Sequence, residues 1–184
     1  MDDDRRLIEE TFPIKEISDE SIYDKRIREG HISVLHPWPA RRPLAASIAT
    51  IYTSLIGFKH EKDLKSKVKK TIRLAKWDNF TKFEPTQEAK KDIITKKIRP
   101  KILDPFSGGG SIPLQAFRLG CDIYAVDYNP VANIILKCGI EFINKYSTRS
   151  KNSGLALDAP NELYEKFKKW SDWIYEQLEK EVGI

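Results

Sequence analysis

The sequence lacks several features that would place it in a specialised class. It has only two cysteines, Cys121 and Cys138, and no Cys-x-x-Cys pair, which argues against a disulfide scaffold or a zinc site. No apolar run reaches the ~18 residues that span a bilayer, and the acidic start of the chain lacks the apolar core of a secretory signal. We therefore expect a cytoplasmic protein without a metal site, in which both cysteines are small core residues.

What is present suits one globular domain of ordinary size. The 184 residues are 40% hydrophobic and 32% charged, with a net charge of +5. Eight basic residues fall between Lys59 and Lys76, against only Glu61 and Asp63. These basic residues could bind the phosphates of a nucleic acid. A helix face exposed to solvent explains the cluster equally well. The nucleic-acid candidates within it are Lys65, Lys67, Lys69, Lys70 and Arg73.

Hydrophobic spacing predicts a mostly helical extension over residues 1–99. Ser18 suits an N-cap, with Ile22 and Ile27 facing inward, and Pro43 suits the first position of a buried helix that stops near Gly57. After a polar loop near 147–154, a last amphipathic helix starts near residue 161. We expect one structural domain overall, made of residues 1–99, 100–146 and 147–184, and the expected helices before residue 100 cover 18–28, 43–56, 59–76 and 85–98.

The hydrophobic pattern changes after residue 100. Two short apolar runs, 101–104 and 122–127, are typical of buried parallel strands. Between them lies a helix over about 112–119, with a proline in its first turn and Gly120 after its end. Another helix begins at Asn129 and Pro130 and runs to about residue 146. The order strand, glycine loop, helix, strand predicts a crossover between parallel strands.

The glycine loop is the strongest candidate for a binding site. Three successive glycines, at the point where a parallel strand ends, allow a ligand to approach the backbone. The second strand ends in Asp127, where nucleotide-binding folds place a carboxylate that accepts hydrogen bonds from ribose hydroxyls. Pro113 replaces the third glycine of a dinucleotide fingerprint, and no Gly-Lys-Ser/Thr follows, so a P-loop is excluded. The remaining alternative is a flexible turn without a ligand.

The string Asp-Pro-Phe-Ser-Gly-Gly-Gly, which starts at Asp104, resembles the Asp-Pro-Phe-x-Gly-Ser-Gly signature of amino-methyltransferases that act on DNA. This resemblance implies that the loop cradles S-adenosylmethionine, with Asp104 near the methionine ammonium and Phe106 beside the adenosine. It also implies that Asp127 holds the ribose. The implied cofactor-binding residues of the two motifs are Asp104, Pro105, Phe106, Ser107, Gly108, Gly109, Gly110, Asp127, Tyr128 and Asn129.

A second resemblance lies upstream, over residues 36–44. With residues 7–9 and 30–33, this segment is similar to the start of the large prokaryotic adenine-specific DNA methylases that carry a zinc ribbon. It implies that Pro39, Ala40 and Arg41 pack on the cofactor. That family usually has two tryptophans before Ala-Arg-Arg, whereas this chain has Trp38-Pro39. Arg41 and Arg42 could contact phosphate or the cofactor carboxylate, and helix entry or an internal ion pair explains them equally well. His31 and His36 are expected to be structural hydrogen-bonding residues.

Amino-methylation of a base needs an Asp/Asn-Pro-Pro-Tyr/Phe tetrapeptide, and this sequence contains none. It also lacks the Pro-Cys nucleophile of cytosine ring methylation, so no residue is a catalytic candidate. We expect a partial Rossmann-like S-adenosylmethionine-dependent methyltransferase fold, of the α/β class, with an N-terminal helical extension. The expected function is the cofactor-binding portion of a DNA adenine-N6 methyltransferase, with a second chain or a further C-terminal part supplying the tetrapeptide. The alternatives are a non-catalytic nucleic-acid-binding or regulatory subunit, and a methyltransferase for RNA or small molecules.

Overall fold

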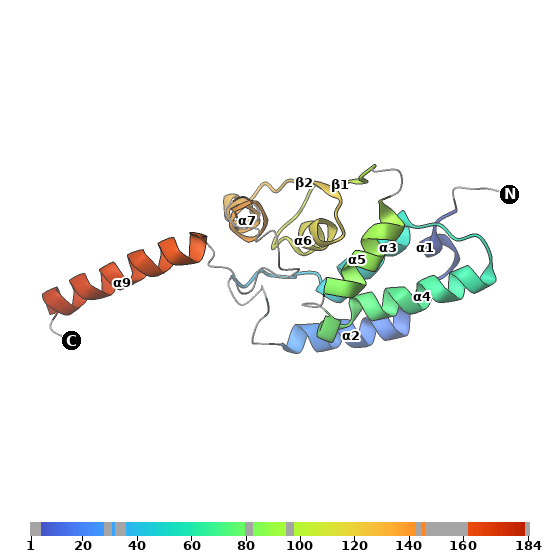
Figure 1. The fold of residues 1–184 in the computed structure, drawn as a ribbon, viewed down its shortest axis with the longest axis horizontal. Coiled ribbons are helices and arrows are strands. Elements are labelled where there is room, and N and C mark those ends of the chain that lie inside the picture. Colours follow the sequence, from blue (N-terminus) through green and yellow to red (C-terminus); the bar gives the residue numbers. More distant parts are fainter. Residues whose placement is uncertain are drawn as a thin grey trace. The chain divides into compact units, whose positions relative to one another are not determined.

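The structure, a computed structural model, describes residues 5–27, 31, 36–79, 83–94, 98–142, 145 and 162–182. Its contacts divide the chain into two compact units, Met1–Gly139 and Ile140–Ile184. The fold is mixed α/β and mostly helical, with a small parallel sheet, as Figure 1 shows. None of the helices within these described ranges is long and apolar enough to cross a membrane.

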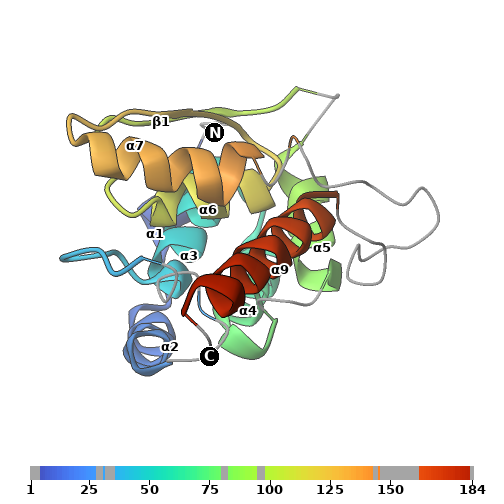
Figure 2. The ribbon, with the colours of Figure 1, turned by 90° about the vertical axis from the view of Figure 1, so that its left-hand side faces the viewer.

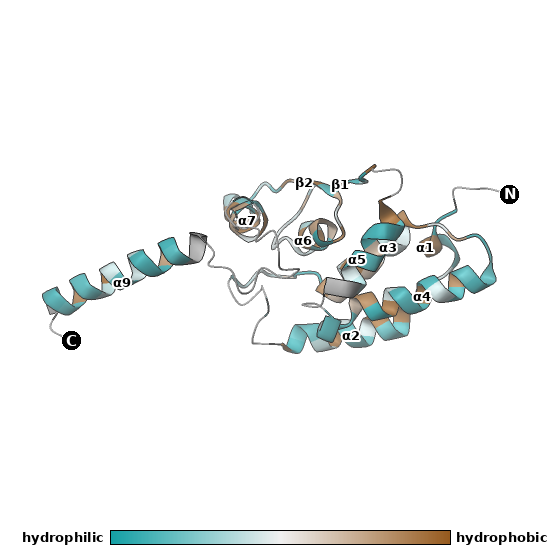
Figure 3. Cartoon of the chain, viewed as in Figure 1, coloured by the Kyte–Doolittle hydropathy of each residue, from teal (hydrophilic) through white to brown (hydrophobic). Residues whose placement is uncertain are grey.

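The first unit begins with helices that lie before the sheet in the chain. Helix α3 is apolar on most sides, and eight of its twelve residues are buried, as its sequence predicts. It packs against α1, α2, α4, α5 and α6 and therefore forms the centre of this unit. Figure 3 shows a different pattern on α4, where hydrophilic residues outnumber the hydrophobic ones between them. The helices are α1 (Leu7–Glu10), α2 (Ile14–Arg26), α3 (Leu44–Leu55), α4 (Glu61–Ala75) and α5 (Phe83–Ile93), with a 3-10 turn, η2, at Trp77–Asn79.

The predicted strand–loop–helix–strand segment is confirmed. Strand β1 (Lys101–Asp104), helix α6 (Ser111–Arg118) and strand β2 (Asp122–Ala125) follow one another, and the strands pair in parallel from Lys101 with Asp122 to Asp104 with Ala125. Helix α6 packs against both strands and against α3, so it joins the sheet to the helical layer (Figure 2).

The two faces of this sheet differ. Ile102 and Ile123 pack against the core cluster on one face. Leu103 and Tyr124, which are neighbours in the register, lie on the opposite face and are more than half exposed. Within the described residues β1 pairs on one side only, with β2. The sheet therefore presents an apolar face and an unpaired strand edge.

Helix α7 (Pro130–Leu136) follows β2 and continues into a π-helical turn, η3 (Lys137–Phe142). The side chain of Asn129 accepts a hydrogen bond from the Val131 N–H, so the predicted start of this helix is confirmed. Cys121 is buried, but Cys138 is exposed on the π-helical turn. The expectation that both cysteines are core residues is therefore wrong for Cys138.

Helix boundaries differ from the prediction at two places. Helix α2 begins four residues before Ser18, with Pro13 at the N-cap position. Its buried residues are Ile17 and Asp24, and Ile22 is exposed, so the inward position predicted for Ile22 is wrong. Ile22 follows Ile17 by five residues, which turns it about 140° around the helix and away from the core. Helix α5 begins at Phe83 and ends at Ile93, short of the predicted residue 98.

The described helix of the second unit is α9 (Glu162–Val182), which has 21 residues and starts where the sequence predicts. Its large apolar side chains are exposed. The polar loop predicted at 147–154 lies outside the described residues.

Candidate functional site

The glycine loop joins the carboxyl end of β1 to the first turn of α6. The Ser107 N–H donates to the Val126 carbonyl at 3.0 Å, and the Ser107 hydroxyl donates to the Asp104 carbonyl at 2.9 Å. The Gly110 N–H donates to the Ser107 carbonyl at 2.8 Å. Gly110 occupies the N-cap position of α6 with a φ of 79°, a left-handed conformation that favours glycine. These bonds fix the loop across the ends of both strands.

The side chain of Asp127, two residues after β2, holds the loop through hydrogen bonds. Its Oδ2 accepts a hydrogen bond from the Gly108 N–H at 2.7 Å, and its Oδ1 accepts one from the Asn129 N–H at 2.8 Å. The N–H groups of Asn129 and Gly108 lower the pKa of this carboxyl group, so Asp127 is anionic at neutral pH. A carboxylate has about four acceptor positions, and two of these remain for further donors.

The other predicted cofactor residues take three kinds of position. Phe106 and Tyr128 project into solvent at the ends of the two strands, 85% and 101% exposed. Asp104 is buried, and its Oδ1 accepts from the Phe106 N–H at 3.2 Å. Pro105 is exposed, and Asn129 is used as the N-cap of α7. Asp104 and Phe106 therefore precede the glycines by a few residues, and Asp127, which Tyr128 follows, reaches them through its hydrogen bond to Gly108.

Trp38 is the residue of this region that sequence reasoning missed. A Cβ added to Gly108 would lie 2.6 Å from the Trp38 Nε1, and one added to Gly109 would lie 2.9 Å from the Trp38 Cβ. No real Cβ atom tolerates such distances, so the glycines leave room for the indole. Consecutive glycines signal that something approaches the backbone, but the sequence does not show whether this is a ligand or a side chain.

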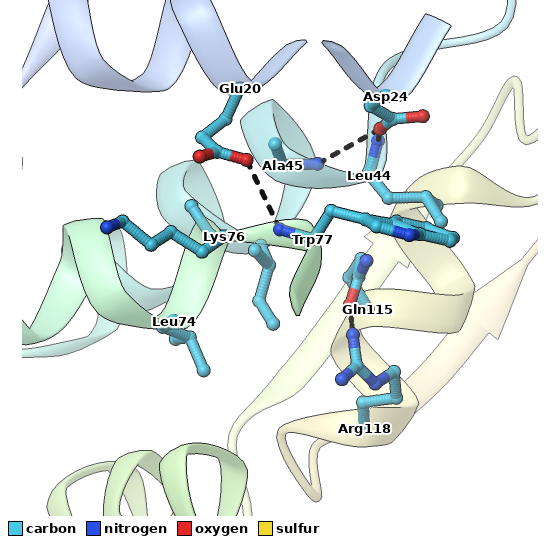
Figure 4. A pocket seen from close by; sticks show the side chains of 11 residues that line it. Glu20, Asp24, Leu44, Ala45, Leu74, Lys76, Trp77, Gln115 and Arg118 are labelled. Atoms are coloured by element: carbon cyan, nitrogen blue, oxygen red, sulfur yellow. Dashed lines mark hydrogen bonds between the residues drawn. The ribbon is translucent and has the colours of Figure 1, made fainter. Parts of the chain in front are cut away.

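Arg41 lies in a buried network and not on the loop. Its Nη1 donates to the Asp24 Oδ1 at 3.1 Å, so the internal ion pair is the alternative that the structure favours. Asp24, on α2, also accepts hydrogen bonds from the Leu44 and Ala45 N–H groups at the start of α3 (Figure 4). A buried carboxylate is thus compensated by a guanidinium and by a helix N-terminus.

Two neighbours of Arg41 that the resemblance assigns to the cofactor remain at the surface. Pro39 and Ala40 are exposed. Ala40 has a φ of 53°, the one left-handed backbone conformation among the described non-glycine residues. This turn places Trp38 on the loop and Arg41 in the network, so it sets the direction of both side chains.

His31 completes this network, in the structural role expected for it. Its ring stacks on Trp77 with 5.2 Å between centroids, and its Nε2 lies 2.7 Å from the Asp24 Oδ1. An ionised carboxylate can only accept, so Nε2 carries the proton that it donates to Asp24. Burial and the charge of Arg41 lower the pKa of His31, against the opposing effect of Asp24. His36, in contrast, is exposed and contacts the Pro37 carbonyl at 3.0 Å.

The lowered pKa of His31 predicts a loss of stability in mild acid. The unfolded chain, with a pKa near 6.5 for this residue, binds more protons than the folded chain. Its contribution is therefore complete above about pH 6.5 and is lost as the pH falls below it. We expect the melting temperature to fall between about pH 7.5 and about pH 5.5, and His31→Gln to reduce this dependence. An equal slope for wild type and variant in thermal melts would contradict the assignment.

Two cavities lie elsewhere in the first unit. A small one of about 10 Å³, room for about one water, is lined by Asp24, Trp77, Gln115 and Arg118 among others (Figure 4). A larger apolar groove of about 340 Å³ runs between α3, Ile102 of β1 and Ile112 of α6. Neither of these two cavities has the glycine loop in its lining. No cluster of metal-binding side chains occurs in the part of the chain that the structure describes.

Most of the predicted nucleic-acid residues on α4 are engaged in ion pairs within the chain. Lys67 pairs with Asp63, Lys70 with Asp92 and Arg73 with Glu88. Lys65 pairs with Glu61, and Lys69 is exposed. These ion pairs lower the positive charge that the helix offers to phosphates. They favour the solvated-face interpretation of this segment.

Comparison with known proteins adds a family match over part of the chain. Residues 11–80 match the model of a family described as "Protein of unknown function (DUF1156)". No curated protein and no solved structure matches the chain significantly. The matched residues include α2, the Asp24 network, Trp38, α3 and α4, and end before β1. The match therefore covers three of the helices before the sheet and leaves out α1, α5 and the glycine loop.

Proposed function

We propose that this chain is the S-adenosylmethionine-binding portion of a DNA adenine-N6 methyltransferase with a Rossmann-like fold. The observation that carries the proposal is the attachment of Asp127 to the glycine loop, through the Gly108 N–H, at the carboxyl ends of two parallel strands. Ligands of open α/β sheets bind at this edge. The resemblance of the loop to methyltransferase signatures selects S-adenosylmethionine among the possible nucleotides.

The residues present fit the nucleoside end of this cofactor. The free acceptor positions of the Asp127 carboxylate suit the two ribose hydroxyls. Phe106 and Tyr128 are exposed after β1 and β2, and an adenine ring could stack on either. At the amino-acid end the Asp104 carboxylate is buried and its Oδ1 accepts from the Phe106 N–H, so its Oδ2 would have to receive the ammonium group. This end would have to enter beside the Trp38 indole, because that ring already lies against Gly108 and Gly109.

Calorimetric titration with S-adenosylhomocysteine tests the proposal, with NAD as the control ligand. We expect the first to bind and the second not to bind. Asp127→Ala should weaken binding by about 1–3 kcal/mol, because the ribose hydroxyls lose their acceptor. Asp122→Ala is the matched control, since Asp122 is the first residue of β2, whereas Asp127 lies two residues beyond its last. It should leave the affinity unchanged.

Two results would count against the proposal. Failure of the folded wild-type chain to bind S-adenosylhomocysteine would remove the cofactor site as described. Equal losses in Asp127→Ala and Asp122→Ala would show that binding does not use Asp127. A circular dichroism spectrum of each variant would separate loss of binding from loss of fold.

Methyl transfer to adenine would need the tetrapeptide that this sequence lacks, so the proposal includes a partner segment that carries it. Two observations support such a partner. Strand β1 has a free edge within the described residues, with the exposed Leu103 on it. The apolar groove between α3 and β1 opens beside this edge. An added apolar strand that pairs with β1 would cover both, and duplex DNA would then be the substrate of the complete enzyme.

A further inference from the structure

The segment that precedes α3 lies across the glycine loop. The Trp38 side chain contacts the loop so closely that a Cβ added to Gly108 or Gly109 would lie 2.6 or 2.9 Å from its atoms. The same side chain is partly exposed, and the two residues that follow it are exposed. Trp38 therefore covers the glycines from the solvent side. We call residues 38–41 the strap.

The strap contains a strained backbone conformation. Ala40 has a φ of 53°, in the left-handed region that a Cβ disfavours. A residue stays in this region only where its surroundings hold it there. Since Ala40 itself is exposed, its neighbours in the strap must provide the hold. One of them, Trp38, does so by packing on the loop.

The other end of the strap is fixed to the protein core through Arg41. Its guanidinium donates to the Asp24 carboxylate at 3.1 Å and to the Asp24 carbonyl at 3.3 Å. Asp24 is 2% exposed and also accepts from the first N–H groups of α3. Arg41 is thus the fixed end of the strap, and Ala40 is the point at which the Trp38 end can turn.

We propose that the strap opens and closes over the glycine loop, and that the contact between Arg41 and Asp24 holds it closed. In the closed position the indole occupies the space beside the Gly108 and Gly109 backbone. A ligand that contacts this backbone needs the indole to move aside, and the turn at Ala40 then relaxes. Its apparent affinity is reduced in proportion to the fraction of molecules in which the strap is open. The part of this inference that concerns the ligand rests on the proposed function, and the opening of the strap does not.

Two substitutions of Ala40 should shift the strap in opposite directions. Ala40→Gly removes the steric cost of the closed turn, so it should raise the melting temperature and weaken the binding of S-adenosylhomocysteine about tenfold. Ala40→Pro forbids the closed turn, because proline fixes φ at about −65°. It should lower the melting temperature and strengthen binding. A turn with a structural role alone would not make the more stable variant the weaker binder.

Fluorine NMR of the chain labelled with fluorotryptophan follows the indole directly. The Trp38 signal, identified by its loss in Trp38→Phe, should move toward the shift of an exposed indole in Ala40→Pro and in Arg41→Ala. S-adenosylhomocysteine should move the wild-type signal in the same direction. Arg42→Ala is the matched control, because it removes the same charge from the next residue, which is exposed and lines the apolar groove. It should leave the Trp38 signal in place.

The outcomes separate the strap from the cofactor site. A Trp38 signal that stays in place in both Ala40→Pro and Arg41→Ala would overturn the strap, whether or not a ligand binds. An Ala40→Gly variant that binds S-adenosylhomocysteine as tightly as the wild type would overturn it as well. If the signal moves in both variants and the wild-type chain does not bind S-adenosylhomocysteine, the proposed cofactor site fails and the strap stands. Circular dichroism spectra verify that each variant is folded.

Discussion

Replacement of Asp24 by alanine is expected to lower the free energy of unfolding by about 3–5 kcal/mol, the cost of removing one partner from a buried ion pair. Asp24 is 2% exposed, and its carboxylate accepts from Arg41, His31 and the first N–H groups of α3. Without it, the Arg41 guanidinium remains mostly buried and the helix loses its N-terminal acceptor. A domain with a typical stability of about 5–15 kcal/mol would lose a large share of it.

Urea denaturation followed by circular dichroism measures this loss. Asp24→Asn keeps the shape and one acceptor oxygen, so we expect it to retain part of the stability. Arg41→Ala removes the charge that Asp24 compensates and should be less harmful than Asp24→Ala, because the helix N-terminus keeps its carboxylate. A change below about 1 kcal/mol in Asp24→Ala would show that water reaches these groups and replaces the carboxylate.

The second large effect is expected at Gly108. Its φ of 50° costs an alanine about 1–2 kcal/mol in backbone strain. The new Cβ would also lie 2.6 Å from the Trp38 Nε1, so the indole must move. Such overpacking adds about 1–3 kcal/mol. We therefore expect Gly108→Ala to destabilise the first unit and to shift the indole, with a change in its fluorescence.

A double-mutant cycle separates the two contributions. In a Trp38→Ala background the steric part should vanish and the backbone strain should remain, giving a coupling of about 1–3 kcal/mol. Gly120→Ala is the matched control, since Gly120 has a φ of 79° and its added Cβ would meet Ile94 and Lys90 instead. Additive effects of Gly108→Ala and Trp38→Ala would rule out the contact between loop and indole.

Much of this fold could be predicted because its signals are local. The glycine loop, the parallel strands and the N-cap at Asn129 depend on residues within a few positions of one another. The buried helix at Leu44–Leu55 is apolar on most sides, so its composition alone predicts that it is buried. Asp127 was placed near the loop because the ends of adjacent parallel strands meet at one edge of the sheet.

The residues that could not be predicted depend on distant partners. Asp24 occupies the inner face of α2 because Arg41 and the start of α3 compensate its charge, and hydrophobic spacing cannot reveal this. Asp24 in turn holds the Arg41 side chain inside the protein, away from the loop. Cys138 was expected in the core, but the π-helical turn at Lys137–Phe142 changes the helical period and exposes it. Trp38 reaches the loop across about 70 residues of chain.

The central position of α3 also affects how the chain folds during synthesis. Residues of α1 to α5 leave the ribosome before β1, and α3 can then pack with its helical neighbours while the strands are still unmade. The later helix α6 docks on a surface that already exists. The glycine loop therefore forms beside helices that have already packed. It does not depend on an isolated two-stranded sheet, which would be marginal in water. Shortening the nascent chain from its amino end should impair folding of the loop even though every residue of the loop is still present.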